Sequence, residues 1–503
     1  MTTLITIVVY FLILLAISRF TGQSSNDAFF RGNRQSPWPL VAFGMVGASI
    51  SGVSFVSVPG MAIRSDMTYL QMCMGFIVGY IVVAFLLIPL YYRYRLTSIY
   101  TWLDHRYGTV SRKTGAWFFI ISKLCSSAAK LYLACLILQS SLSVSFPVIG
   151  SSSWAFPIIA ATTLVLIWAY THRNGIGALV WTDSLQTLCM LVALVLIIAK
   201  SISMLGMGPG DALQAIWNDT HSRIFEFSDW SSSQHFVKQF LSGIFVVIVM
   251  TGLDQDMMQK NLTCRTKRDA QKDLCSYGLL FLPVNFLLLS LGILLMLLHT
   301  QNGTMLPTVP DQLLPAYVVS GSMGQAVVVF FTIGVVASAF SSADSALTAL
   351  TTSFCIDILD IDKTSEAHSA ERIRKRVHAV TILVALLAIL AFKAIGTGSA
   401  IDLIYMLVGY TYGPLLGLFA FGILTRRMPR ERFVPFIAIL SPVLCYMIDR
   451  LSQLFWNYRF GYELLLLNGL ITFIALACCT TSKSKIEATN DSVKNSVIAH
   501  NSP

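Results

Sequence analysis

The chain has 503 residues, of which 55% are hydrophobic and only 12% are charged. Soluble domains carry about 25% charged residues, so this composition excludes a soluble globular domain and indicates a membrane protein. The formal net charge of +10 at pH 7 comes from short loops between apolar runs and not from a basic soluble module, which argues against a nucleic-acid partner.

Apolar segments long enough to cross a bilayer, about 17–25 residues, recur along the chain. Backbone amides find no water in the hydrocarbon, and segments of this length satisfy them as helices. No small-residue cleavage site follows the first segment, so it is interpreted as a helix and not as a signal peptide. We predict an all-α polytopic membrane protein with about 13 transmembrane helices. They lie near 3–19, 38–62, 68–92, 115–143, 155–171, 178–204, 236–259, 274–299, 323–355, 376–396, 401–424, 433–455 and 461–480.

Charged loops give the predicted orientation. Lysine and arginine are concentrated in alternate loops, including one at 260–272 to which Lys260 is assigned, and in the tail. The side rich in these residues is cytoplasmic, which predicts a multi-pass protein of the plasma (inner) membrane with its N-terminus outside and its C-terminus in the cytoplasm. Residues 1–480 are predicted to form a single transmembrane domain. Residues 481–503 are too polar and too few to fold alone and are predicted to be a flexible cytoplasmic tail.

One predicted span, which contains "VVASAFSSADSALTALTT" (335–352), carries polar groups where a membrane helix is usually apolar. The serines alone are equally compatible with close helix packing. A carboxylate at mid-membrane costs at least ~2.5–3.5 kcal/mol and indicates function. Hard oxygen ligands with no partnering arginine suit a small hard cation such as sodium. The residues on or beside this helix face are Ser338, Ser341, Ser342, Asp344 and Ser345.

Two other segments have features of the same kind. Asp183, in "ALVWTDSLQ" (178–186), has a predicted depth that matches Asp344, although alone it could be an interfacial helix cap. The span 38–62 contains "MVGASISGVSFVSVPG", in which glycine and proline loosen the helix. Interrupted helices near the midplane are the recurrent binding device of secondary transporters; a packing face of glycine and serine is the alternative.

These features resemble the sodium:solute symporter family, and most closely its bacterial sialic acid symporters, over roughly residues 25–430. The resemblance implies a LeuT-type architecture of two inverted five-helix repeats, about 38–204 and about 236–424, with extra helices at 3–19, 433–455 and 461–480. It also implies a transporter and not an enzyme. The best-matched segments are "GASISGVSFVSVPGMAIRSDMTYL" (47–70), "ALVWTDSLQ", "DQDMMQKNLTCRTKRDAQKDL" (254–274), "ASAFSSADSALTA" (337–349) and "DLIYMLVGYTYGPLLGLFAFGIL" (402–424).

The resemblance implies two sodium sites. Asp344 stands where the sialic acid symporters have a serine, which leaves proton coupling open as well. The first site would use the carbonyls of Gly47, Ile50 and Ser338 and the hydroxyls of Ser341 and Ser342. The second site would use Asp183, Ser341, Asp344 and Ser345.

The same resemblance places a solute site. Ser126 takes the position of the arginine that binds the carboxylate in the sialic acid symporters, and Val53 and Ser54 replace the glutamate and glutamine of the galactose symporter, so neither solute is implied. "FVVIVM" (245–250) makes one wall apolar. The predicted lining residues are Ser49, Ser51, Ser54, Tyr69, Cys73, Ser126, Val246, Val247 and Met250. The aromatic group Tyr405, Tyr410 and Tyr412 is placed to gate or stack, although packing is the alternative for each of these tyrosines.

Lys130 lies mid-helix, four residues after Ser126 and therefore on the same helix face. We predict that it anchors an acidic group on the solute; a structural lysine paired with a neighbouring helix is the alternative. The predicted function is sodium-coupled import of a carboxylate or sugar acid by alternating access, with the solute, sodium ions and the bilayer as partners and no obligate protein partner evident. Alternatives are a sodium- or proton-coupled transporter of a neutral sugar, polyol or amino acid, an ion channel, and a membrane-embedded sensor.

Overall fold

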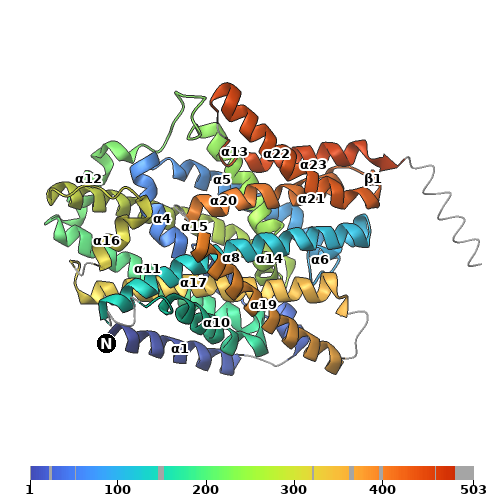
Figure 1. Ribbon diagram of the computed structural model, residues 1–503, viewed down its shortest axis with the longest axis horizontal. Helices are drawn as coiled ribbons and strands as arrows, with labels where there is room; N and C mark the ends of the chain where they lie inside the picture. Colours follow the sequence, from blue (N-terminus) through green and yellow to red (C-terminus); the bar gives the residue numbers. More distant parts are fainter. Residues whose placement is uncertain are drawn as a thin grey trace, which may run out of the picture.

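The computed structural model describes residues 2–21, 25–50, 52–145, 152–319, 322–361, 367–395, 400–458 and 460–481. These residues fold into one helical bundle in which many of the long helices run in roughly the same direction (Figure 1). The first helix, α1, and the last pair, α22 and α23, lie on opposite flanks of this bundle (Figure 1). The all-α architecture predicted from the sequence is therefore confirmed.

The first half of the described chain contains the helices α1 (Thr2–Thr21), α2 (Asn26–Arg31), α3 (Trp38–Ser49), α4 (Gly52–Ser65), α5 (Tyr69–Val82), α6 (Ile88–Arg93), α7 (Thr101–Arg106), α8 (Thr109–Ser145), α10 (Ala155–Asn174), α11 (Ile176–Met204) and α12 (Pro209–Asn218). The second half contains α13 (Phe236–Val247), α14 (Gln255–Asn261), α15 (Lys267–Gln301), α16 (Leu313–Val319), α17 (Gln325–Ser353), α19 (Ala367–Ile395), α20 (Ala400–Thr411), α21 (Gly413–Leu424), α22 (Val434–Trp456) and α23 (Leu464–Cys478).

Short elements extend or connect these helices. The π-helical segments are η2 (Val83–Leu87), η4 (Ile248–Gly252) and η6 (Phe354–Ile358), and the 3-10 turns are η1 (Gly32–Arg34), η3 (Thr220–Ser222), η5 (Pro310–Gln312) and η7 (Glu431–Phe433). Two short strands, β1 (Met428–Pro429) and β2 (Thr480–Thr481), pair in antiparallel orientation and join the end of α23 to the segment before α22.

Each predicted span coincides with a helix or with consecutive helices in the structure. Among the described residues, eight helices are long and apolar enough to cross a membrane, or up to ten if each of two bent pairs counts as one span. Shorter apolar helices lie at Val8–Phe20, Gly413–Leu424 and Leu464–Cys478. The number of thirteen crossings therefore stays a prediction.

Two of the spans are sharply bent. The first bend, of 61°, separates α3 from α4 at the segment predicted to be interrupted, and Ile50 there leaves the helical conformation with φ −81° and ψ 73°. The second bend, of 70°, separates the α13–η4 helix from α14 and was not predicted. Asp254 starts the new helix, because its carboxylate accepts a hydrogen bond from the Asp256 amide at 2.8 Å and thereby caps the N-terminus of α14.

The first bend lies against α11 and α17, which also pack along each other. Small residues permit this close approach. A Cβ atom on Gly47 would lie 2.1 Å from the Thr187 hydroxyl, and one on Gly44 would lie 3.0 Å from Asp183 Cβ. A larger residue at Gly47 would push α3 away from α11, so the two glycines bring the broken helix next to the carboxylate of α11.

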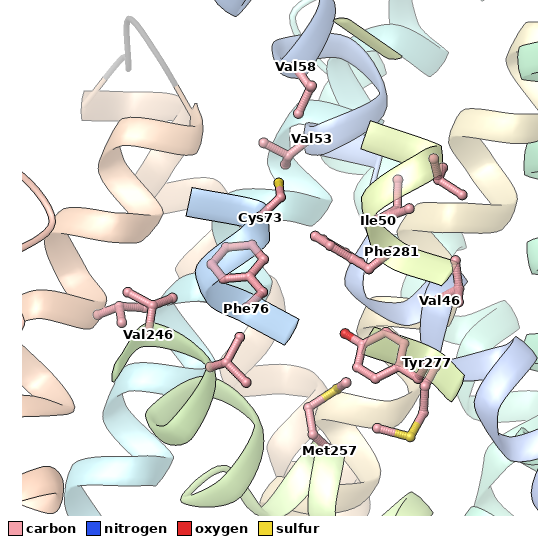
Figure 2. Close-up of a cluster of buried hydrophobic side chains, with 14 of the residues drawn as sticks. Val46, Ile50, Val53, Val58, Cys73, Phe76, Val246, Met257, Tyr277 and Phe281 are labelled. Carbon is pink, nitrogen blue, oxygen red and sulfur yellow. The ribbon is translucent and has the colours of Figure 1, made fainter. Parts of the chain in front are cut away.

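On its other side the broken helix packs on apolar side chains. Figure 2 shows Cys73 and Phe76 of α5 and Val246 of α13 on one side of a cluster, with Tyr277 and Phe281 of α15 on the other. Val46, Ile50, Val53 and Val58 of the broken helix join the same cluster (Figure 2). This packing holds the two halves of the broken helix in place around the unwound residues.

Candidate cation and solute site

The unwound part of the broken helix contacts α17 through four oxygen atoms. The Ser338 hydroxyl donates a hydrogen bond to the Ile50 carbonyl at 2.9 Å, and the Ser342 hydroxyl donates to the Ala48 carbonyl at 2.9 Å. Ser338 and Ser342 are only 1% and 5% exposed. Carbonyls freed at an unwound segment coordinate ions in secondary transporters, and oxygen ligands of this kind suit hard cations.

Three residues predicted for the first sodium site, Ile50, Ser338 and Ser342, therefore meet in the structure. Ala48 contributes the second carbonyl and was not predicted. Gly47 lies one residue away and packs against α11, while the Ser341 hydroxyl is directed to Asp183. The composition of the ion site stays a prediction. The atom of Ser338 that contacts Ile50 is its hydroxyl and not the carbonyl that was predicted as a ligand.

The residues predicted for the second sodium site are also brought together. The Ser341 hydroxyl donates to Asp183 Oδ1 at 2.7 Å, and the backbone amide of Ser345 donates to Asp344 Oδ1 at 2.6 Å. Tyr170 of α10 donates its hydroxyl proton to Asp344 Oδ2 at 2.7 Å. Asp183 and Asp344 are 1% and 0% exposed, so both carboxylates lie inside the protein.

Lys260 completes this cluster, although the sequence places it in a cytoplasmic loop. In the structure it belongs to α14, is buried, and lies with its Nζ 2.7 Å from Asp183 Oδ2. The assignment to a loop was wrong because the 70° bend before α14 turns this short helix into the interior. The sequence signal is weak, because in "DMMQKNL" only the two methionines and the leucine are typical of a buried helix.

A second buried lysine, Lys123 of α8, holds the start of α14. Its Nζ lies 3.0 Å from Asp254 Oδ2 and 2.7 Å from Asp256 Oδ2, and all three side chains are at most 11% exposed. The Tyr412 hydroxyl, at the junction of α20 and α21, donates to Asp254 Oδ2 at 2.7 Å. We refer to Lys123, Asp254 and Asp256 as the Lys123 clamp. It ties α8 to the second broken helix, and sequence reasoning did not find it.

The residues predicted to line the solute site are distributed between apolar and polar surroundings. Tyr69, Cys73 and Val247 are buried, and Figure 2 shows Cys73 within the apolar cluster. The hydroxyls of Ser49 and Tyr277 are hydrogen-bonded to each other, and Tyr80 donates to Tyr277 at 2.8 Å. Val246 is buried as well, while Ser54 and Met250 are half-buried. Ser51 and the side chain of Tyr405 lie outside the described residues.

Lys130 lies on the face of α8 that points into the bundle. It follows Lys123 by seven residues, or two helical turns, and Ser126 and Ser127 between them are 7% and 6% exposed. Lys130 itself is half-buried, and in the described part of the chain it makes no hydrogen bond or ion pair. The alternative of a lysine paired with a neighbouring aspartate is therefore not seen there.

Comparisons with known proteins show which family the chain resembles. The family model "Sodium:solute symporter family" matches residues 29–431. The human sodium/iodide cotransporter is 26% identical over 412 residues, covering 80% of this chain and 61% of its own length. The sodium/sialic acid symporter NanT of Aliivibrio fischeri is 26% identical over 419 residues, covering 80% and 79%. The human sodium-coupled monocarboxylate transporter 2 is 23% identical over 414 residues, covering 80% and 64%.

Solved structures show the same fold. A sodium-coupled sialic acid symporter in a substrate-bound, outward-open state superposes with a TM-score of 0.80 at 20% identity, over 95% of this chain and 97% of the other. Mhp1, a nucleobase-cation-symport-1 family transporter, superposes with a TM-score of 0.57 at 14% identity, over 89% and 93%. The LeuT-type architecture is thus confirmed. With a family model that covers most of its length, the chain belongs to the sodium:solute symporter family.

Proposed function

We propose that the chain is a sodium-coupled symporter that imports a small organic anion, a carboxylate or a sugar acid, by alternating access. Sodium coupling is supported by one observation. The carbonyls of Ala48 and Ile50 lie within hydrogen-bonding distance of the buried hydroxyls of Ser342 and Ser338. A sodium ion at these oxygens would bind the unwound part of the broken helix to α17. Inward sodium movement would then drive transport, since each charge gains about 2.3 kcal/mol per 100 mV.

The observation that supports an anionic solute is Lys130. A half-buried ammonium with no hydrogen bond or ion pair among the described residues requires water, a changed protonation state or a ligand of opposite charge. The serines on the same helix face, Ser126 and Ser127, offer hydroxyls beside it. Lysine binds as a point charge and does not fix the orientation of a carboxylate, so these hydroxyls would orient the solute. The three relatives named above are named for iodide, sialic acid and monocarboxylates, which are all anions.

The proposed architecture has two repeats, 38–204 and 236–424. Its support is that the first helix of each range is broken, by 61° in α3–α4 and by 70° in the α13–η4 helix and α14. In the proposed orientation the loops rich in lysine and arginine face the cytoplasm of the plasma membrane, with the N-terminus outside. Labelling of single cysteines introduced into the N-terminal and C-terminal ends, in intact and opened cells, tests this orientation.

The class of solute can be identified by a thermal-stability screen. Purified protein is heated in sodium chloride or in choline chloride with sialic acid, a hexuronate, lactate, iodide, a neutral hexose or an amino acid. A bound solute raises the unfolding temperature. We expect the organic anions to do so only in sodium. Stabilisation by the neutral hexose or the amino acid alone would contradict the proposal, and stabilisation by iodide alone would assign the site to an inorganic anion.

Replacing Lys130 by methionine is expected to weaken binding of the solute found in this way at least roughly 30-fold, which corresponds to about 2 kcal/mol for the loss of a buried charge partner. Sodium-dependent stabilisation without solute should remain, because Lys130 does not contact the four oxygens. Lys200→Met, on α11, is the matched control and should bind as the wild type does. Unchanged affinity in Lys130→Met would refute the role of this lysine.

A further inference from the structure

The cluster around Asp183 contains a cation that belongs to the protein. Lys260 Nζ lies 2.7 Å from Asp183 Oδ2, and the exposed fractions of the two side chains are 2% and 1%. The ammonium makes this ionic contact but no hydrogen bond of regular geometry in the described part of the chain. The interaction of Asp183 with Lys260 is therefore mainly electrostatic, as its interaction with a metal cation would be.

A sodium ion at the same carboxylate would have to compete with this ammonium. Two unit positive charges a few ångströms apart repel each other strongly when buried, because the interior screens them poorly. The backbone of α14 tethers Lys260 beside Asp183. The local concentration of the ammonium is therefore fixed by the fold, whereas that of a sodium ion depends on the solution. The tethered ammonium is thus expected to exclude a second sodium ion from Asp183 and Ser341.

Asp344, the other carboxylate of the predicted second site, is held by hydrogen bonds. It accepts from the Tyr170 hydroxyl at 2.7 Å, from the Ser345 amide at 2.6 Å and from the Ser345 hydroxyl at 3.2 Å. A carboxylate that accepts several hydrogen bonds is stabilised as an anion without a metal ion. Both carboxylates of the cluster therefore have protein partners at the position predicted for a metal ion: the ammonium of Lys260 for Asp183 and three hydrogen-bond donors for Asp344.

We infer that Lys260 occupies the second cation position as a built-in ammonium, and that the protein binds a single sodium ion, at the oxygens of Ala48, Ile50, Ser338 and Ser342. This inference rests on the proposed function. Residues Asp183, Ser341, Asp344 and Ser345 then form a cation site whose permanent occupant is a side chain. The ion pair links α14 of the second broken helix to α11, which also packs on the first broken helix.

The number of bound sodium ions can be measured on purified protein without a solute. The free energy of unfolding rises with the logarithm of sodium concentration above the dissociation constant, and its slope in units of RT gives the number of ions. Choline chloride keeps the ionic strength constant. We expect a slope of one for the wild type. We expect two for Lys260→Met, in which Asp183 is freed for sodium, and one for Lys260→Arg, which keeps the positive charge.

The double variant Asp183→Asn/Lys260→Met removes both charges and is expected to return the slope to one. It is also expected to fold if Lys260→Met alone does not, since it leaves no unpaired charge at this position. A slope of two in the wild type would overturn the inference while leaving sodium coupling intact, and so would a slope of one in folded Lys260→Met. A slope of zero in the wild type would instead refute the proposed function.

Discussion

Ser342→Ala is expected to abolish sodium-driven uptake at the sodium concentrations that are sufficient for the wild type, while the protein still folds. The Ser342 hydroxyl of α17 donates to the Ala48 carbonyl at 2.9 Å, near the end of α3 and beside the break, so its loss removes one of four proposed ion ligands. We expect the sodium concentration for half-maximal uptake to rise at least roughly 10-fold, on the scale of perturbed metal sites. The loss of one neutral hydrogen bond costs only about 1 kcal/mol of stability, so folding should survive.

Thr332→Val is the matched control for this prediction. Thr332 lies on the same helix, α17, and is buried, but in the described part of the chain its hydroxyl donates to the Val328 carbonyl of its own helix, at 2.8 Å, and to no other helix. Uptake assays in proteoliposomes over a range of sodium concentrations compare the two variants. Thr332→Val should keep the sodium dependence of the wild type. If Ser342→Ala also kept the sodium dependence of the wild type, the proposed position of the ion site would be wrong.

Of the variants proposed for this protein, Lys123→Met is expected to lose the most free energy of unfolding. Removing one partner of a buried ion pair costs about 3–5 kcal/mol, because the remaining charge is left uncompensated. In the Lys123 clamp two carboxylates, those of Asp254 and Asp256, share the one ammonium. The free energy of unfolding, measured by denaturant titration in mixed micelles, should fall by about this amount.

The clamp offers its own test of mechanism. Asp254 keeps three donors without Lys123, namely the Tyr412 hydroxyl and the amides of Asp256 and Met257. The double variant Lys123→Met/Asp256→Asn should therefore recover part of the lost stability, since only the carboxylate with fewer donors depends on the lysine. Equal losses in the single and double variants would show that the lysine contributes through packing and not through charge.

The sequence predicts the helices well because apolar length is a local property. It also predicts the first break, since glycine, proline and serine are concentrated in residues 44–60. The serine face of α17 is predicted as well, because its serines are spaced by one helical turn. The close approach of the broken helix to α17 is permitted by Gly52, where an added Cβ atom would lie 3.2 Å from the Val335 carbonyl, and Ser338 and Ser342 make their hydrogen bonds to the broken helix across this contact.

The partners of the buried charges could not be predicted in this way. Tyr170 and Asp344 are 174 residues apart in the chain, and no helical periodicity relates them. Lys260 was assigned to a loop because loop charge and buried charge look alike in sequence when a short helix follows an unexpected bend. Asp254 caps α14 through the nearby amides of Asp256 and Met257, but its ion pair with Lys123 and its hydrogen bond from Tyr412 come from other helices and could not be predicted from the sequence.

Sodium flux through the purified protein tests the central claim most directly. Proteoliposomes receive radioactive sodium outside, with sialic acid, a hexuronate, lactate or no solute. The account predicts that one organic anion accelerates sodium entry, and that Ser342→Ala removes this acceleration while Thr332→Val retains it. Sodium entry at the same rate with and without every solute would contradict the claim, because it would describe a channel or an inert protein and not a symporter.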